Sequence, residues 1–282
     1  MPGNADGQRK QYSHDLIEAE TLKFIESNGK NGKPFFCYAA WTLPHAKHEI
    51  PSHAAFADKP WPEDVKIHAA MIARLDASVG KVLRKLRELN LEQNTIVMFS
   101  SDNGASGPGL ATFQATAGLR GAKRQLYEGG ICMPFLVRWP GKIAAGTVSD
   151  LLTSHVDFMA TAVELSGATP PRNDGISLVP TLLGQKSRPA REFLYWEIYE
   201  GPPSFQQAVR YGKWKGYRTG TEAPLELYDL AADPKETNNL AARHPAEVKA
   251  IEAIMAREHV PSPHYDASKG PSKGRVPVKK KK

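Results

Sequence analysis

The residues best suited to chemistry follow one apolar run. Thr95 to Ser100 is apolar at its centre and stops at Ser101-Asp102-Asn103-Gly104. A buried strand that ends in a carboxylate and an amide brings oxygen donors to its end, and such donors suit calcium or magnesium better than zinc. Asp-Asn-Gly is also a common turn sequence, so the pattern alone supports a turn and a metal site equally.

A second candidate group is cationic. Lys123 lies between Gly121 and the pair Gly129-Gly130, and glycines allow a ligand to approach the backbone closely. An ammonium in that setting is a point charge for a sulfate or phosphate oxygen. Arg120 and Arg124 are alternatives, and a solvated basic loop is the more common state of such a segment.

His45 is the third candidate, because Pro44 before it restricts the local backbone. Its imidazole can donate to an anionic ester or to a leaving oxygen. A loop histidine bonded to the backbone is the more common role for a lone histidine. Both interpretations stay open at this point.

The hydrophobic pattern predicts the elements that position these groups. Apolar strands alternate with helices, which predicts an α/β fold with a mainly parallel sheet and flanking helices. The carboxyl ends of parallel strands share one edge, so His45 and Asp102 would meet there. The expected strands are 35–41, 95–100 and 134–139, and the expected helices are 15–27, 63–90 and 156–166.

The pattern changes near residue 187, where we place a domain boundary. Alternating or aromatic-rich runs at 193–199, 207–217 and 225–230 predict a small antiparallel sheet, and 245–258 predicts a helix. The expected parts are residues 11–186, 187–260 and a basic, disordered tail at 261–282.

Composition narrows the partners. The net charge is +7, but seven basic residues and no acidic ones lie between Lys269 and Lys282, and the rest of the chain is balanced. No aromatic residue interleaves this tail, so we expect no specific nucleic-acid binding. No apolar run is long enough to span a membrane, the first eleven residues contain no signal-peptide core, and two cysteines make neither a disulfide framework nor a zinc site.

Several segments, in order, resemble the sulfatase family, an arylsulfatase-like branch of the alkaline phosphatase superfamily. The resemblance covers residues 11–245 and rests on the ordered set, since no single motif is decisive. The matching segments are Tyr12-Ser-His-Asp-Leu-Ile17, Pro34-Phe-Phe36, Pro44-His-Ala46, Asn94 to Gly104, Leu119-Arg-Gly-Ala-Lys123, Tyr127-Glu-Gly-Gly130, Pro134 to Gly141, Ser154-His-Val-Asp157, Leu227-Tyr-Asp-Leu230, Asp233-Pro234, Glu236 and Asn239-Leu-Ala241.

The resemblance implies hydrolysis of sulfate esters, with carbohydrate sulfates as the favoured substrates. It implies that Asp102 and Asn103 are calcium ligands, that His45 contacts the sulfate or the leaving oxygen, and that Lys123 holds the sulfate. The antiparallel sheet would be the smaller domain of the family. Sulfatases are often exported to the periplasm, the lysosome or the medium.

One departure from the family concerns the nucleophile. Sulfatases carry a Cys- or Ser-x-Pro-x-Arg motif, whose first residue becomes formylglycine, in an N-terminal part for which we find no counterpart here. Cys132-Met-Pro134 imitates the start of that motif, but Leu136 stands at the arginine position. We therefore expect the C-terminal portion of a sulfatase that does not turn over substrate alone. The alternative is a non-catalytic remnant that binds calcium or an anion.

Overall fold

The computed structural model describes residues 4, 5, 7–169, 171–185, 190–199 and 205–262. They fall into two compact units, which we treat separately. The first comprises Met1–Phe99, Ser106–Ala115 and Leu136–Ala145. The second comprises Ser100–Ala105, Thr116–Phe135 and Gly146–Lys282, so the expected basic tail lies mostly outside the described residues.

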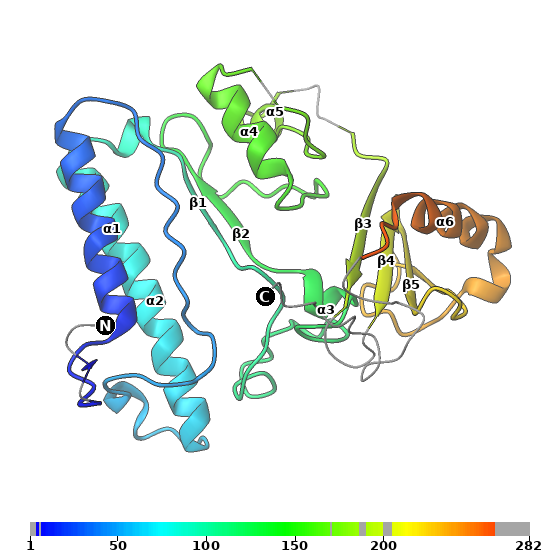
Figure 1. The fold of residues 1–282 in the computed structure, drawn as a ribbon, viewed down its shortest axis with the longest axis horizontal. Coiled ribbons are helices and arrows are strands. Elements are labelled where there is room, and N and C mark those ends of the chain that lie inside the picture. The colour runs from blue at the N-terminus through cyan, green and yellow to red at the C-terminus, as the bar shows by residue number, and fades with distance from the viewer. Residues whose placement is uncertain (1–3, 6, 170, 186–189, 200–204, 263–282) are drawn as a thin grey trace, which may run out of the picture. The chain divides into compact units, whose positions relative to one another are not determined.

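Two long helices dominate the first unit and lie side by side (Figure 1). They are α1 (Ser13–Lys30) and α2 (Glu63–Glu88), and both confirm the predicted helices. Apolar residues at helical spacing bury one stripe of α2, from Val65 through Met71 to Leu86. Short 3-10 turns lie before α2, at Ala54–Phe56, and after it, at Glu92–Asn94.

The contact between α1 and α2 is strongly polar. Arg74 donates to both oxygens of Asp15, at 2.7 and 2.5 Å. The buried His14 Nε2 lies 2.9 Å from the Ser78 hydroxyl. Lys81 Nζ lies 2.6 Å from Glu18, which also accepts from Ser78. Because most of these groups have partners across the interface, the two helices are held in one register.

The predicted strands are only partly confirmed. β1 (Val97–Ser100) pairs with β2 (Phe135–Arg138) in a two-stranded sheet. The expected strand 35–41 is wrong: the structure has extended backbone there with no strand assigned. Phe36 and Tyr38, at alternate positions, are 66% and 81% exposed, while Phe35 and Cys37 between them are only partly buried, so the run is not buried on both faces as predicted. A strand buried on both faces lies inside a sheet. Among the described residues no strand pairs with this run.

The second unit contains the antiparallel sheet, with strand order β3-β4-β5-β6. The strands are β3 (Phe193–Ile198), β4 (Gln206–Tyr211), β5 (Trp214–Thr219) and β6 (Glu226–Asp229). The expected run 207–217 is two strands, because Gly212 takes a φ of +55° and closes a tight hairpin between Tyr211 and Trp214.

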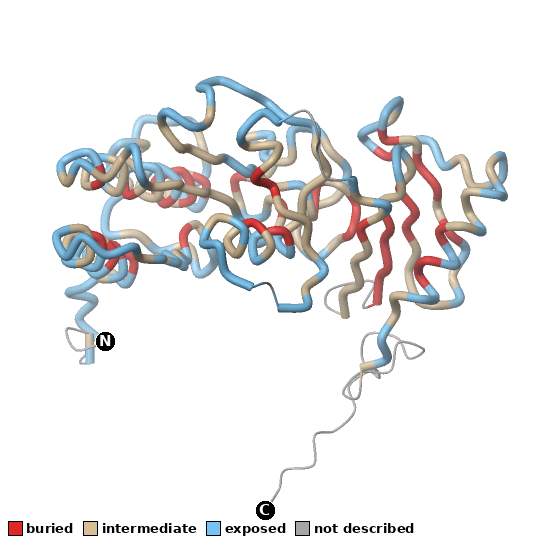
Figure 2. Tube along the Cα trace, turned by 90° about the horizontal axis from the view of Figure 1, so that it is seen from above, coloured by how far each residue is buried: buried red, intermediate tan, exposed pale blue. Residues whose placement is uncertain are grey.

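Alternation along the strands gives this sheet two buried faces. On one face Val209 and Leu227 pack with Ile251 and Met255 of α6 (Pro245–Glu258), a helix predicted from the sequence. On the other face Ala208, Tyr217 and Tyr228 pack with Leu126 and Tyr127. Figure 2 shows the buried stretches along these strands. The segment that carries Lys123 is therefore packed on the sheet.

Short helices complete the second unit. They are α3 (Glu128–Ile131), α4 (Asp157–Ser166), α5 (Val179–Leu182) and a 3-10 turn at Ala241–Arg243. Asp157 is fully buried at the start of α4, where its carboxylate accepts from the Ser154 and Ile176 N–H groups and pairs with Arg191. Among the described residues, no helix has the length and apolar content to cross a bilayer.

Candidate active site

Asp102 and Asn103 lie in the turn that follows β1. Ser100 ends the strand and donates its hydroxyl to the Pro134 carbonyl, at 3.0 Å. Asp102 is exposed, and among the described residues its carboxylate accepts a single long contact of 3.4 Å, from the Ser101 hydroxyl. The Asn103 side-chain N–H donates to the Gly104 carbonyl at 2.9 Å, which leaves Oδ1 as an acceptor for another group. The turn thus presents a carboxylate and an amide oxygen.

The next residue, Gly104, packs against the glycine pair of the cationic segment. Its N–H donates to the Gly130 carbonyl at 2.9 Å. A Cβ on Gly104 would lie 2.2 Å from the Gly129 carbonyl oxygen, closer than any side chain tolerates. Glycine is therefore required here by close backbone contact.

Lys123 joins the same assembly. Its N–H donates to the Ala105 carbonyl at 3.0 Å, directly after the Asp102-Asn103 turn. Its side chain is half-buried, and its ammonium makes no hydrogen bond or ion pair with any other residue in the described part of the chain. A half-buried ammonium with this freedom is suited to holding an anionic group.

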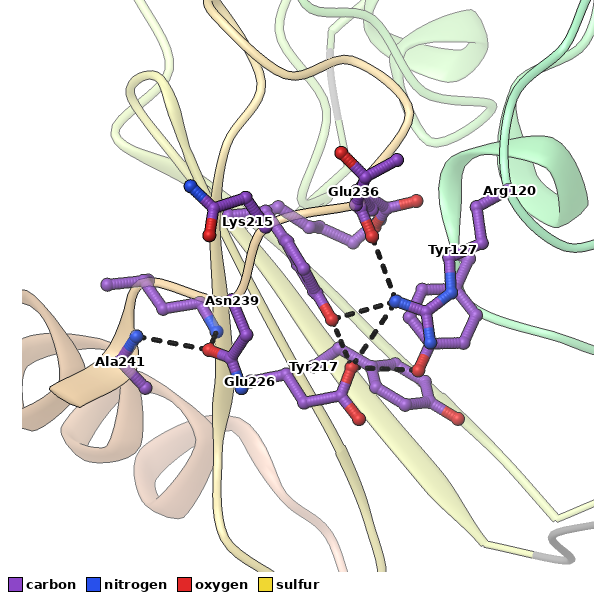
Figure 3. Close-up of polar contacts among 12 residues, drawn as sticks. Arg120, Tyr127, Lys215, Tyr217, Glu226, Glu236, Asn239 and Ala241 are labelled. Atoms are coloured by element: carbon purple, nitrogen blue, oxygen red, sulfur yellow. Dashed lines mark hydrogen bonds and ion pairs between the residues drawn. The ribbon is translucent and has the colours of Figure 1, made fainter.

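Arg120, the first alternative to Lys123, is already occupied (Figure 3). Its Nη1 donates to the Tyr228 hydroxyl at 2.8 Å and to the Glu236 carbonyl at 2.9 Å. Its guanidinium also lies 3.8 Å from the centre of the Tyr127 ring. These contacts make Arg120 a structural cation rather than a free anion-binding group.

The carboxylate of Glu226 lies close to Arg120. Glu226 accepts a hydrogen bond from the Tyr127 hydroxyl at 2.8 Å and another from the Tyr228 hydroxyl. Burial, together with this carboxylate, raises the pKa of Tyr127 far above its usual range and that of Tyr217 to about 12. The tyrosines therefore remain protonated donors at any physiological pH.

A buried ion cluster lies next to this network. Lys215 on β5 is 0% exposed and lies 2.6 Å from the Glu128 carboxylate and 3.5 Å from that of Glu236. Burial raises the pKa of Glu236. Burial acts the same way on Glu128, but the Lys215 ammonium outweighs it and the pKa of Glu128 lies below its ordinary value. Sequence analysis gave no role to Lys215 or Glu128, because a lysine in a strand ordinarily faces solvent.

Gln206 of β4 is a further residue that sequence analysis missed. It is fully buried, its Nε2 donates to the Arg124 carbonyl at 2.8 Å, and its Oε1 accepts from the Leu126 N–H at 3.2 Å. These bonds hold the backbone on the C-terminal side of Lys123.

His45 belongs to the first unit and is exposed. Its Nδ1 lies 2.6 Å from the Ala46 carbonyl, and a carbonyl only accepts, so Nδ1 carries the proton. Nε2 of the neutral ring is then an acceptor, and it donates only when the imidazole is protonated. The structure thus joins Lys123 to the Asp102-Asn103 turn, while the part of His45 in the site stays a prediction.

The calcium prediction meets a partial ligand set. The Asp102 carboxylate and the Asn103 Oδ1 are hard oxygen donors of the kind calcium takes. Among the described residues no group of three or more His, Cys, Asp or Glu gathers as a metal site. The turn supplies two oxygen donors, and calcium binding there stays a prediction.

The nucleophile-like sequence at Cys132 has no place in this site. Cys132 donates to the Glu128 carboxylate at 3.0 Å, and burial and that charge raise its pKa to about 12, which keeps the thiol protonated. The letters Ser-x-Pro-x-Arg do occur, at 187–191. Arg191 there is committed to the buried Asp157, and residue 187 lies outside the described part.

The sequence profile of the family described as Sulfatase matches residues 2–168. A second profile, described as N-sulphoglucosamine sulphohydrolase, C-terminal, matches residues 121–259. The segments that form the site lie within these matches.

Curated relatives agree. An N-acetylgalactosamine-6-O-sulfatase of Bacteroides thetaiotaomicron is 31% identical over 267 residues, which cover 86% of this chain and 50% of that protein. Human arylsulfatase A is 31% identical over 268 residues, covering 85% of this chain and 49% of that protein. The chain thus spans about half the length of the curated relatives it matches.

Solved structures show the same fold. The crystal structure of Ps i-CgsB matches with a TM-score of 0.77 at 24% identity, over 89% of this chain and 55% of that one. A glycosaminoglycan-metabolism protein of Bacteroides thetaiotaomicron, BT33336S-sulf, matches with a TM-score of 0.69 at 28% identity, over 86% and 54%. On the profile match and these relatives, this chain belongs to the sulfatase family.

Proposed function

We propose that the protein hydrolyses sulfate esters of carbohydrates. Family membership supports the reaction class. The substrate class is supported by relatives named as N-acetylgalactosamine-6-sulfatases and by Ps i-CgsB, which was crystallised with a neocarrahexaose. The observation that carries the proposal for this chain is the bond from the Lys123 N–H to the Ala105 carbonyl, at 3.0 Å.

In this proposal each predicted residue has a stated task. Lys123 binds a sulfate oxygen and stabilises the negative charge that develops during hydrolysis. His45, protonated at Nε2, donates to the sulfate or to the leaving oxygen. Asp102 and Asn103 hold calcium as part of a larger ligand set, and bound calcium would offset the charge of the ester.

We also retain the predicted division of the chain. Residues 11–186 are proposed as part of the catalytic domain and 187–260 as the smaller subdomain. The sheet of the second part would then support Lys123 from behind, through Gln206 and the Tyr228–Arg120 bond.

Calorimetry on the purified chain tests the two binding tasks. We expect calcium binding that Asp102→Asn weakens, with Asp150→Asn as the control because Asp150 is also an exposed aspartate. We expect sulfate binding that Lys123→Met weakens about tenfold, the loss of one charged hydrogen bond, with Lys249→Met on α6 as the control. Equal effects of test and control variants would contradict the assignment.

Release of sulfate from N-acetylgalactosamine 6-sulfate tests the reaction itself. Turnover by the chain that Lys123→Met abolishes would establish hydrolysis and refute the predicted absence of a nucleophile. Binding of calcium and sulfate without turnover would favour the alternative, a non-catalytic protein that retains the anion site.

A further inference from the structure

Glu236 occupies an unusual backbone conformation in the turn after β6. Its φ is +54°, in the left-handed region that non-glycine residues seldom adopt. Asp233 holds this turn, because its carboxylate accepts from the Thr237 N–H at 2.8 Å and from the Asn238 N–H at 2.9 Å. These hydrogen bonds hold Glu236 in its left-handed backbone conformation.

Glu236 contacts both ends of the segment that carries Lys123. Its carbonyl accepts from Arg120 Nη1 at 2.9 Å, and its Oε2 accepts from the Glu128 N–H at 2.7 Å. Arg120 and Glu128 flank Lys123 in the sequence, and the Gly129 N–H closes the segment onto the Arg120 carbonyl at 2.7 Å. One residue therefore holds a closed loop at the point where its ends meet.

The side chain of Glu236 is enclosed by the protein. It is 0% exposed, and its remaining partner is the buried Lys215, at 3.5 Å. Lys215 in turn binds the Glu128 carboxylate at 2.6 Å. Glu236 thus binds the main chain of Glu128, and Lys215 binds its side chain. These two contacts restrict the motion of the loop end.

We propose that Glu236 is a positioning residue for Lys123: through the Glu128 N–H it fixes the loop that carries the ammonium, whose backbone is bonded to Ala105 after the Asp102-Asn103 turn. This inference rests on the proposed function, in which Lys123 holds the sulfate group. Glu236 itself touches no substrate in this proposal.

Two substitutions separate the effect of the side-chain length of Glu236 from the effect of its charge. Glu236→Asp keeps the charge beside Lys215 but is one methylene too short for the Glu128 N–H. Glu236→Gln keeps the length and an acceptor oxygen but loses the charge, and the raised pKa of Glu236 indicates that this site tolerates a neutral group. Positioning predicts that the aspartate variant is impaired and the glutamine variant rescues function.

The experiment is sulfate titration by calorimetry, with amide hydrogen exchange at Lys123 and Gly129. We expect Glu236→Asp to weaken sulfate binding about tenfold and to speed exchange at both amides, as expected when a supporting contact is lost. Glu236→Gln should remain close to the parent in both measurements. Glu197→Gln is the matched control, since Glu197 is a partly buried carboxylate of the same sheet that bonds Tyr195 and His259 instead.

Equal losses in the two Glu236 variants, a loss in Glu236→Gln alone, or no loss in either would overturn the inference. Exchange at Val209 in β4 confirms that each variant keeps its sheet. Lys123→Met distinguishes the two levels of the proposal. If it leaves sulfate affinity unchanged, the proposed function fails, while the exchange data still show whether Glu236 fixes the loop.

Discussion

The main-chain N–H of Lys123 donates to the main-chain carbonyl of Ala105 at 3.0 Å. This bond joins two segments that the sequence separates and that carry different chemistry, an ammonium and a pair of oxygen donors. Because both partners are backbone atoms, side-chain substitutions at either position leave the bond possible. The site can therefore be probed through its side chains without breaking its frame.

Replacement of Gly104 by alanine should disturb that frame. The new Cβ would lie 2.2 Å from the Gly129 carbonyl oxygen, so backbone must shift. We expect a loss of about 1–3 kcal/mol in the free energy of unfolding, as for other overpacked sites. Urea denaturation measures it, and sulfate binding should weaken in parallel.

Gly80→Ala on α2 is the control, since the nearest atom to its Cβ is the flexible end of Arg84 at 3.4 Å. Helix propensity predicts a gain of about 0.5–1 kcal/mol there. A Gly104→Ala variant as stable as the parent would show that the glycine contact is looser than described.

Lys215→Met should be among the most destabilising changes in the second unit. It leaves the buried carboxylates of Glu128 and Glu236 without their cation, and breaking a buried pair costs about 3–5 kcal/mol. Lys213→Met is the control two residues away, because its pair with Asp229 is half-exposed and is worth about 0–1 kcal/mol. Denaturation curves of equal midpoint for the two variants would contradict the burial of Lys215.

Arg191→Met should expose the dependence of Asp157 on its partner. Asp157 is fully buried, so loss of the guanidinium leaves an uncompensated charge and should cost about 3 kcal/mol. Adding Asp157→Asn should recover part of the loss, because the amide carries no charge and its one oxygen still accepts from either the Ser154 or the Ile176 N–H group. A double-mutant cycle by urea denaturation measures the coupling, and additive losses would argue against it.

The contact between α1 and α2 should weaken in mild acid. Burial lowers the pKa of His14 below its ordinary value of 6.5, so the folded state favours the neutral ring. Such a group contributes stability that is present above 6.5 and lost as the pH falls through the folded-state pKa. Unfolding followed by helical circular dichroism from neutral pH down to about 5.5 stays above the ordinary range of carboxylates. His14→Gln should flatten the curve, and an unchanged slope would contradict the assignment.

The parts of the fold that depend on local pattern could be predicted from the sequence. The apolar stripe from Val65 to Leu86 and the proline start of α6 each define a helix without reference to distant residues. The predicted strand 35–41 failed because an apolar run becomes a strand only when another strand pairs with it. Its exposed Tyr38 shows that this run is not part of the core.

The candidate site divides in the same way. Asp102 and Lys123 could be named as candidates because glycines and a strand end mark them locally. Gln206 and Glu236 were not given roles, because they bond residues 80 and 108 positions away. Nothing in the adjacent sequence of a strand glutamine or a turn glutamate records a partner at that separation.

The closure of the segment from Arg120 to Gly129 has a practical consequence. Since its ends are clamped by the Gly129–Arg120 bond and by Glu236, the interior position Ala122 can be diversified while the frame stays in place, and Arg124, at a φ of +75°, can be changed to glycine or asparagine. A library at these two positions would alter the surroundings of the ammonium and not its anchor. Under the proposed function, selectivity among sulfated sugars would be separable from the scaffold that carries the cation.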